Sequence, residues 1–88
     1  MEAKLVLYYL ESCQECRIIR EMLAQLGLTY VCVNVNPVKT QRQEVFEITG
    51  QYSVPVLIDG KTVMTSKDNI LEYLVEHYPH NTVRPVKY

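Results

Sequence analysis

The sequence predicts an α/β domain built on a mixed four-stranded sheet, with helices on both faces of the sheet. Short runs of β-favouring apolar residues alternate with longer segments in which apolar residues recur at helical spacing. An Asp-Gly pair joins the last two apolar runs, and this pair is typical of a β-hairpin. The chain has 88 residues, which supports one domain with one core. The predicted order of elements is therefore β-α-β-α-β-β-α.

The first part of the chain reads as a strand, a helix and a second strand. Residues 4–10 form a nearly continuous apolar run, as expected of a strand that is covered on both faces. Residues 14–26 place their apolar side chains on one helical face, and this helix can be capped by Ser12 and ended by Gly27. Residues 30–35 alternate and are rich in β-branched side chains. Because β-α-β crossovers are right-handed, the two strands are predicted to be parallel.

The middle of the chain adds a second helix and a hairpin. Residues 39–49 are predicted to be helical, with Gly50 at the end of the helix. The expected buried side chains of this helix are Val45, Phe46 and Ile48. Residues 54–58 and 61–64 flank the Asp-Gly pair, so they are predicted to form two antiparallel strands.

The last predicted helix begins after Ser66, whose hydroxyl can cap it. Its apolar face is expected to contain Ile70, Leu71, Leu74, Val75 and Tyr78. Pro79 follows the predicted end of the helix. The sequence therefore predicts one domain over residues 1–80 and a C-terminal tail over residues 81–88.

Charge and hydropathy exclude several classes of protein. The chain has 9 basic and 10 acidic residues and a net charge of −1, which removes the electrostatic basis for nucleic-acid binding. No apolar run approaches the roughly 20 residues that span a bilayer, so no membrane association is predicted. The apolar stretch at residues 5–10 is too short for a signal peptide. We therefore expect a cytoplasmic protein.

The 3 cysteines are too few for a disulfide scaffold. Cys13 and Cys16 form a Cys-Gln-Glu-Cys motif directly after the first predicted strand. In a reducing compartment such a close pair is typical of a redox-active or metal-binding site, although two small buried side chains are an alternative. Zinc needs about four ligands, and the other candidate ligands are scattered, so no metal site is predicted. Cys32 is expected to be a core residue, because it stands among valines in the second predicted strand.

The spacing of the pair favours thiol chemistry. Two cysteines three positions apart on a first helical turn can bring their sulfur atoms within bonding distance. The first of them lies at the helix N-terminus, where free backbone N–H groups and the helix dipole favour a thiolate. The thiolate is the nucleophile of disulfide exchange. Within a β-α-β unit, the motif therefore indicates a redox-active dithiol.

Four stretches of the chain resemble the glutaredoxins. They are the Cys-Gln-Glu-Cys helix start, residues 49–55, the hairpin at residues 58–60 and residues 66–69. The resemblance covers residues 4–78, and residues 54–78 are also similar to the N-terminal domain of glutathione transferases. Because those enzymes carry a second, all-helical domain and this chain ends after 88 residues, a complete transferase is not expected.

The resemblance implies a thioredoxin-like fold and a glutathione-dependent thiol-disulfide oxidoreductase that needs no bound cofactor. Cys13 would attack a disulfide, and Cys16 would resolve the mixed disulfide that forms. The expected substrates are protein disulfides and glutathione mixed disulfides, and the electrons come from glutathione or from a reductase. The expected assembly is a monomer.

The same resemblance assigns a glutathione site. It implies a cis peptide bond before Pro55, which would expose the backbone N–H and C=O of Val54 to a bound peptide. Ser66 and Asp68 match the region that holds the γ-glutamyl end of glutathione. A helix N-terminus with a serine hydroxyl can bind the carboxylate of that end, and Asp68 can bind its amine. Capping of the last helix is the alternative role of both residues.

Several positions depart from the glutaredoxin pattern. Gln14 and Glu15 stand between the cysteines in place of Pro-Tyr, and Leu10 stands where the family has a lysine. The carboxylates of Glu11 and Glu15 are expected to disfavour a thiolate and to repel anionic glutathione. The basic residues that can compensate are Arg17, Arg20, Lys39 and Arg42.

Two alternative functions are compatible with the sequence. The resemblance to glutaredoxins also implies that two chains can hold an iron–sulfur cluster through their Cys13 thiolates, with glutathione completing the ligands, as some members of that family do. Those members tend to lack Pro-Tyr between the cysteines, as this chain does. The other alternative is a non-catalytic thioredoxin-like interaction domain. The retained cysteine pair and Pro55 argue against that second alternative.

Overall fold

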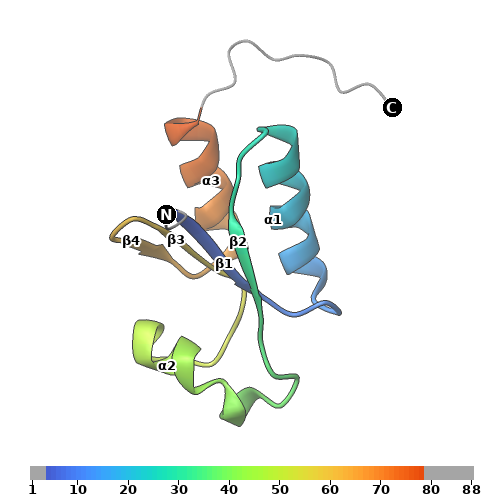
Figure 1. The fold of residues 1–88 in the computed structure, drawn as a ribbon, viewed down its shortest axis with the longest axis vertical. Coiled ribbons are helices and arrows are strands. Elements are labelled where there is room, and N and C mark those ends of the chain that lie inside the picture. Colours follow the sequence, from blue (N-terminus) through green and yellow to red (C-terminus); the bar gives the residue numbers. More distant parts are fainter. Residues whose placement is uncertain (1–3, 79–88) are drawn as a thin grey trace.

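The computed structural model describes residues 4–78 (Figure 1). Its elements are β1 (Leu5–Tyr9), α1 (Gln14–Gln25), β2 (Val31–Asn34), a 3-10 helix (Lys39–Gln41), α2 (Gln43–Thr49), β3 (Val56–Asp59), β4 (Thr62–Met64) and α3 (Lys67–His77). The order of elements predicted from the sequence is confirmed. The predicted tail, residues 81–88, lies outside the described residues. No helix within residues 4–78 is long and apolar enough to cross a membrane.

The four strands form one mixed sheet in the order β2-β1-β3-β4. β1 and β2 are parallel, as predicted. β3 is antiparallel to β1 and to β4, with Val56 opposite Tyr8 and Leu57 opposite Met64. The Asp-Gly pair turns the chain between β3 and β4, where Gly60 has a φ of 64°. This positive φ favours glycine, which explains why the pair is a reliable hairpin signal.

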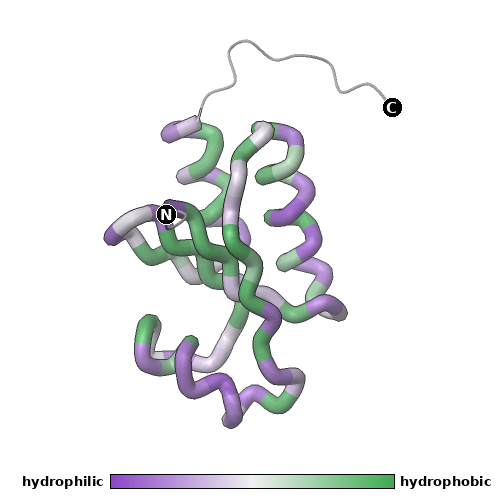
Figure 2. The backbone as a smooth tube through the Cα atoms, in the orientation of Figure 1, coloured by the Kyte–Doolittle hydropathy of each residue, from purple (hydrophilic) through white to green (hydrophobic). Residues whose placement is uncertain are grey.

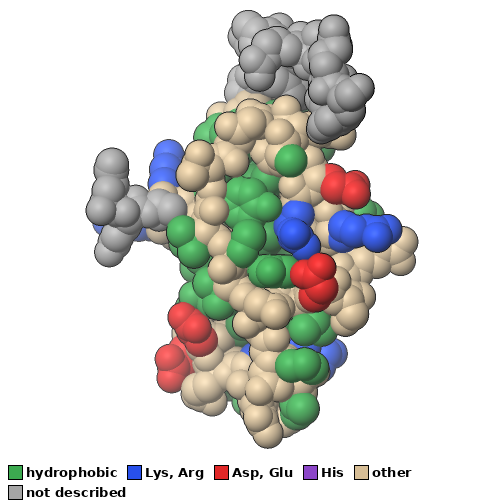
Figure 3. Space-filling view, turned by 45° about the vertical axis from the view of Figure 1, so that its right-hand side comes forward, with side chains coloured by type: hydrophobic (Ala, Val, Ile, Leu, Met, Phe, Trp, Pro, Cys, Tyr) green, Lys and Arg blue, Asp and Glu red, His purple; other side chains and the backbone are tan. Residues whose placement is uncertain are grey.

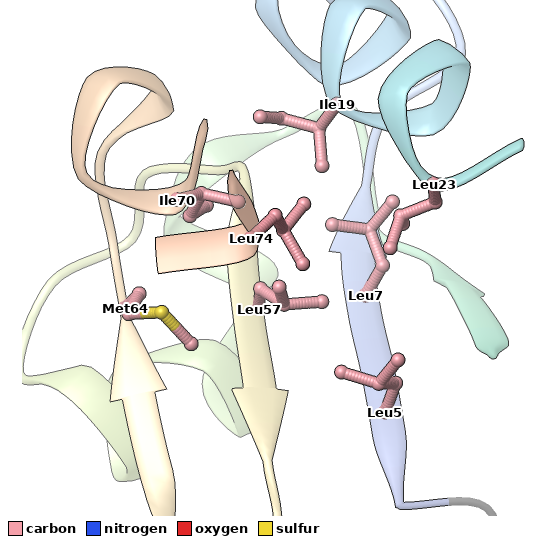
Figure 4. Packing of buried hydrophobic residues seen from close by; sticks show 8 residues of the cluster. All are labelled: Leu5, Leu7, Ile19, Leu23, Leu57, Met64, Ile70 and Leu74. Carbon is pink, nitrogen blue, oxygen red and sulfur yellow. The ribbon is translucent and has the colours of Figure 1, made fainter. Parts of the chain in front are cut away.

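Helices cover both faces of the sheet, as predicted. α1 and α3 pack on one face, and α2 packs on the other. The larger core cluster contains Leu5, Leu7, Ile19, Leu23, Leu57, Met64, Ile70 and Leu74 (Figure 4). On the other face, Val45 of α2 belongs to a cluster with Tyr8, Val35 and Val56. Figure 2 shows hydrophobic residues along the central strands, as expected of strands that are buried on both faces.

The predicted second helix is split into two parts by Arg42. The backbone of this residue has non-helical angles, with φ −98° and ψ 60°. Its buried guanidinium donates hydrogen bonds to the carbonyl oxygens of Asn36, Pro37 and Tyr52, at 2.7, 3.3 and 3.0 Å. Through these hydrogen bonds Arg42 links the segment before α2 to the segment that leads into β3.

Three burial predictions are wrong. Cys32 is exposed, because β2 is an edge strand that is paired along one side only. Phe46 is 40% exposed and stacks on the ring of Tyr52, with 4.8 Å between ring centroids, while Val45 fills the core position of α2. Val75 is 51% exposed, because the buried stripe of α3 is narrower than predicted.

A buried carboxylate fastens α3 to the hairpin. Oδ2 of Asp59 accepts hydrogen bonds from the hydroxyl groups of Tyr73 at 2.7 Å and Tyr78 at 2.8 Å. Its Oδ1 lies 3.6 Å from Nζ of Lys4. Burial alone raises the pKa of a carboxyl group, but the two hydroxyl groups and Lys4 outweigh it, so the pKa of Asp59 lies below its ordinary value.

The substitution Asp59→Asn is expected to lower the free energy of unfolding at pH 7 by about 1–3 kcal/mol, because it weakens two buried hydrogen bonds. The lowered pKa of Asp59 means that its ionised form stabilises the fold above the ordinary value of 3.8, and that this stability is lost as the pH falls through the folded-state pKa. Urea unfolding at pH 7 and in acid measures both effects, with the exposed Glu72→Gln as control. If Asp59→Asn lowered the free energy of unfolding equally at both pH values, the ionised form of Asp59 would not be what stabilises the fold.

Candidate active site

The predicted site residues come together at one end of the sheet, where β1 ends and β3 begins. The loop that follows β1 carries the cysteine pair. The antiparallel register of β1 and β3, continued past the strand ends, places Val54 level with Leu10 at the start of that loop. The register of β3 and β4, continued in the same way, places Ser66 level with Pro55. Segments far apart in the sequence therefore approach the cysteine pair together.

Cys13 is the N-cap residue of α1, and the prediction that Ser12 caps this helix is wrong. The backbone N–H of Cys13 donates to the carbonyl of Leu10 at 2.9 Å, which places Ser12 inside a turn. The sulfur of Cys13 accepts a hydrogen bond from the backbone N–H of Cys16 at 3.1 Å. The Cys13 sulfur thus meets an N–H group at the positive end of a helix.

Cys16 lies in a very different environment. Its side chain is fully buried, whereas that of Cys13 is partly exposed. Burial, followed by the interaction of the thiol with the side chain of Cys13, raises the pKa of the Cys16 thiol to about 12. Cys16 is therefore a protonated thiol at neutral pH, whereas the sulfur of Cys13 is accessible at the start of the same helix.

The peptide bond between Val54 and Pro55 is cis, as the resemblance implies. Pro55 is buried and Val54 is half-buried. Within residues 4–78, the backbone N–H and C=O of Val54 make no hydrogen bond. Free backbone groups just before the start of a strand can pair with an extended peptide.

Ser66 is the N-cap residue of α3, as predicted. Its Oγ accepts a hydrogen bond from the backbone N–H of Asn69 at 3.1 Å, so the hydroxyl proton is available to another acceptor. Asp68 is exposed in the first turn of α3, and its carboxylate lies 3.7 Å from Nζ of Lys67. Ser66 and Asp68, the two residues predicted to bind the γ-glutamyl end of glutathione, are thus both accessible. Ser66 also caps α3.

A hollow of about 420 Å³ opens beside the nucleophile and is lined by Glu11, Ser12, Cys13, Gln14 and Arg17. The carboxylate of Glu11 lies 3.6 Å from the guanidinium of Arg20, which also lies 4.9 Å from the centre of the Tyr9 ring. Figure 3 shows basic and acidic side chains next to each other on the face of the molecule that carries α1. The charge of Glu11 is therefore partly balanced within the protein.

Sequence reasoning did not separate the roles of the candidate basic residues. Arg42 is buried on carbonyl groups and Arg20 is paired with Glu11, while Arg17 lines the hollow beside Cys13. The signal that distinguishes Arg17 is its position one helical turn after Cys13. Gln14 also lines the hollow, and no signal in the sequence places it there.

The fold and the site together define a thioredoxin-like protein with a cysteine pair at the start of its first helix. The family model described as glutathione S-transferase, N-terminal domain, matches residues 7–82. The chain therefore belongs to the family of glutathione S-transferase N-terminal domains.

Two curated proteins illustrate the range of this family. The chain is 34% identical over 68 residues to the stringent starvation protein A homologue of Haemophilus ducreyi, a match that covers 77% of this chain and 31% of that protein. It is 36% identical over 84 residues to a zeta-class glutathione S-transferase of Euphorbia esula, with 93% of this chain and 36% of that protein covered. The chain thus spans about a third of the length of the curated relatives that it matches.

Solved structures agree with this family. A glutathione transferase homologue from Drosophila mojavensis with bound glutathione has a TM-score of 0.79 at 29% identity, over 86% of this chain and 36% of that one. Glutathione transferase E6 from Drosophila melanogaster has a TM-score of 0.77 at 36% identity, over 85% of this chain and 35% of that one. The predicted thioredoxin-like fold and the similarity to the N-terminal domain of glutathione transferases are confirmed.

Proposed function

We propose that the protein is a small glutathione-dependent thiol-disulfide oxidoreductase that acts through Cys13 and Cys16. The observation that carries this proposal is the difference between the two sulfur atoms. Cys13 is accessible and accepts an N–H hydrogen bond at a helix N-terminus, while the buried Cys16 has its pKa raised to about 12. One sulfur is prepared to attack, and the other is held as a protonated thiol behind it.

The proposed reaction begins when the Cys13 thiolate attacks one sulfur of a substrate disulfide. The new bond is a mixed disulfide, and the other substrate sulfur leaves as a thiolate that takes a proton from water. Cys16 then attacks the Cys13 sulfur and gives up its proton to the substrate sulfur that leaves, which releases the reduced substrate as a thiol and leaves a Cys13–Cys16 disulfide. Two molecules of glutathione reduce this disulfide and are themselves oxidised to glutathione disulfide, so two electrons are transferred in each cycle.

The second part of the proposal is a glutathione site at the same end of the sheet. The free backbone groups of Val54, beside Pro55, would pair with the peptide backbone of glutathione. The hydroxyl of Ser66 at the N-terminus of α3 would bind the γ-glutamyl carboxylate, and Asp68 would bind the amine of the same group. The relationship to a glutathione transferase homologue that was solved with bound glutathione supports this assignment.

The proposal is tested by two reduction assays run in parallel. One assay couples the protein to glutathione and its reductase, and the other couples it to thioredoxin reductase. Each is run with a protein disulfide and with a glutathione mixed disulfide. We expect turnover with glutathione on the mixed disulfide, and no turnover in either assay would reject the proposed activity.

A further inference from the structure

We infer that two copies of this chain pair through strand β2, edge to edge and antiparallel, so that their two sheets join into one. The partner of the exposed edge is thus the same strand of a second copy, related to the first by a two-fold axis. The inference does not rest on the proposed function, and it replaces the monomer that is expected from the sequence.

Strand β2 has one unpaired side. It lies at an edge of the sheet, and no other strand within residues 4–78 pairs with its outer side (Figure 1). All of its residues except Val33 are exposed, and Val31 is 45% exposed. An unpaired edge presents backbone N–H and C=O groups that can continue the ladder with another chain.

A hydrogen bond just after β2 shows which of its backbone groups face outward. The N–H of Val35 donates to the carbonyl of Tyr9 in β1 at 2.8 Å. The N–H and C=O of one residue in a strand point to the same side, and this side alternates along the strand. The backbone of Val33 therefore also faces β1, while the N–H and C=O groups of Cys32 and Asn34 point away from the sheet.

These outward groups select one register for an antiparallel pair of copies. If Val33 lies at the two-fold axis, Cys32 of each copy stands opposite Asn34 of the other, and every outward N–H and C=O group of β2 gains a partner. The side chain of Val33 then meets its own copy at a position where facing side chains are closest. The two Cys32 residues are offset by roughly 7 Å along the strand, so the pairing leaves them too far apart for a disulfide.

The composition of this edge and its surroundings favours self-pairing. Residues 30–35 read Tyr-Val-Cys-Val-Asn-Val and lack the lysine, proline and other charges that protect edge strands. A hollow of about 390 Å³ runs along α1 to the residue before β2, and its charged lining residues are Arg17, Arg20, Glu11 and Glu21. Because these charges cancel, and the whole chain has a net charge of −1, electrostatic repulsion between two copies is weak.

The experiment changes the outward side of β2 and compares matched positions. Cys32→Pro removes an outward N–H group, which edge strands tolerate, and its control Cys32→Ser keeps that group. Val31→Lys adds a charge to the paired edge. Its control Val63→Lys makes the same change at a valine that is 41% exposed in the other edge strand, β4. The mass of each protein is measured by sedimentation from micromolar to millimolar concentration in a reducing buffer, with circular dichroism as a check on the fold.

We expect the wild type, Cys32→Ser and Val63→Lys to change from monomer mass to dimer mass as the concentration rises. Cys32→Pro and Val31→Lys should need at least about tenfold higher concentration, because the two-fold axis makes each substitution act twice in the interface.

Amide hydrogen exchange of the wild type locates the contact. The N–H groups of Cys32 and Asn34 should exchange quickly in dilute protein and slowly in concentrated protein. The N–H groups of Val31 and Val33, which face β1, should exchange slowly in both.

A wild type that stays monomeric at millimolar concentration would overturn the inference. So would a dimer that Cys32→Pro and Val31→Lys leave unchanged, or one in which the exchange of the Cys32 and Asn34 amides does not depend on concentration. None of these results bears on the redox activity of Cys13 and Cys16, so the proposed function is tested separately.

Discussion

Replacing Cys13 with serine is expected to abolish disulfide exchange, with a loss of at least about a thousandfold in rate. The sulfur of Cys13 is the accessible member of the pair and the one that accepts the N–H hydrogen bond of the helix N-terminus. A serine hydroxyl in the same place is not ionised at neutral pH, and it is a poor nucleophile toward sulfur. No other thiol in residues 4–78 occupies a comparable position, because Cys16 is fully buried and Cys32 lies within the edge strand β2.

The measurement is the glutathione-coupled reduction of a mixed disulfide by the wild type and by Cys13→Ser. Cys32→Ser serves as the matched control, since it makes the same chemical change at an exposed cysteine of the edge strand β2. The control should retain full activity. Residual turnover in Cys13→Ser that is lost only when Cys32 is also replaced would move the nucleophile to Cys32.

Replacing Cys16 with serine is expected to separate the two substrate classes. Reduction of a protein disulfide should fall by about a hundredfold, because Cys16 is the thiol that displaces the bound protein from Cys13. Reduction of a glutathione mixed disulfide should stay within about tenfold of the wild type, because a second glutathione can attack the Cys13 mixed disulfide directly. The buried position of Cys16, directly behind the Cys13 sulfur, is the structural reason for this division of roles.

The two classes are compared in the same preparation of Cys16→Ser, with thermal unfolding as a check on the fold. Serine in a fully buried site also costs stability, so rates are measured well below the midpoint of unfolding. An equal loss on both substrate classes would show that Cys16 supports Cys13 structurally and does not resolve mixed disulfides.

Much of the fold could be predicted from sequence because its signals are local. The apolar run of β1, the helical spacing of α1 and the Asp-Gly turn each depend on neighbouring residues. The ends of α1 and α2 were predicted for the same reason, since Gly27 and Gly50 have φ values of 69° and 80° that favour glycine.

The failed predictions depend on how elements are arranged in space. Cys32 reads as a core residue because its strand alternates, but its exposure follows from the edge position of β2, which no local pattern reveals. Arg42 interrupts the second helix through hydrogen bonds to carbonyl groups on both sides of it in the chain. Cys13, and not Ser12, is the N-cap residue of α1. The turn after β1 extends to Cys13, whose backbone N–H donates to the carbonyl of Leu10, so the helix begins after Cys13.

The candidate site likewise has features that local sequence motifs predict and features that depend on the arrangement of side chains in space. The resemblance to glutaredoxins predicted the site residues, which are the cysteine pair, Val54, Pro55, Ser66 and Asp68. The sheet register brings the segments that carry these residues to one end of the sheet. Motifs could not show which basic residue faces the nucleophile. The position of a basic group depends on the direction of its side chain. In the structure Arg20 is paired with Glu11, whereas Arg17 lines the hollow beside Cys13.

The proposed function requires that Cys13 and Cys16 form a reversible redox pair. It is tested most directly by equilibrating the protein in glutathione buffers of increasing oxidising strength, trapping the free thiols and identifying the disulfide-linked peptides by mass spectrometry. We expect one dominant intramolecular disulfide between Cys13 and Cys16, which forms and disappears with a two-electron midpoint, while Cys32 stays outside it. A dominant disulfide that contains Cys32, or a Cys13–Cys16 pair that stays reduced throughout the titration, would contradict the account.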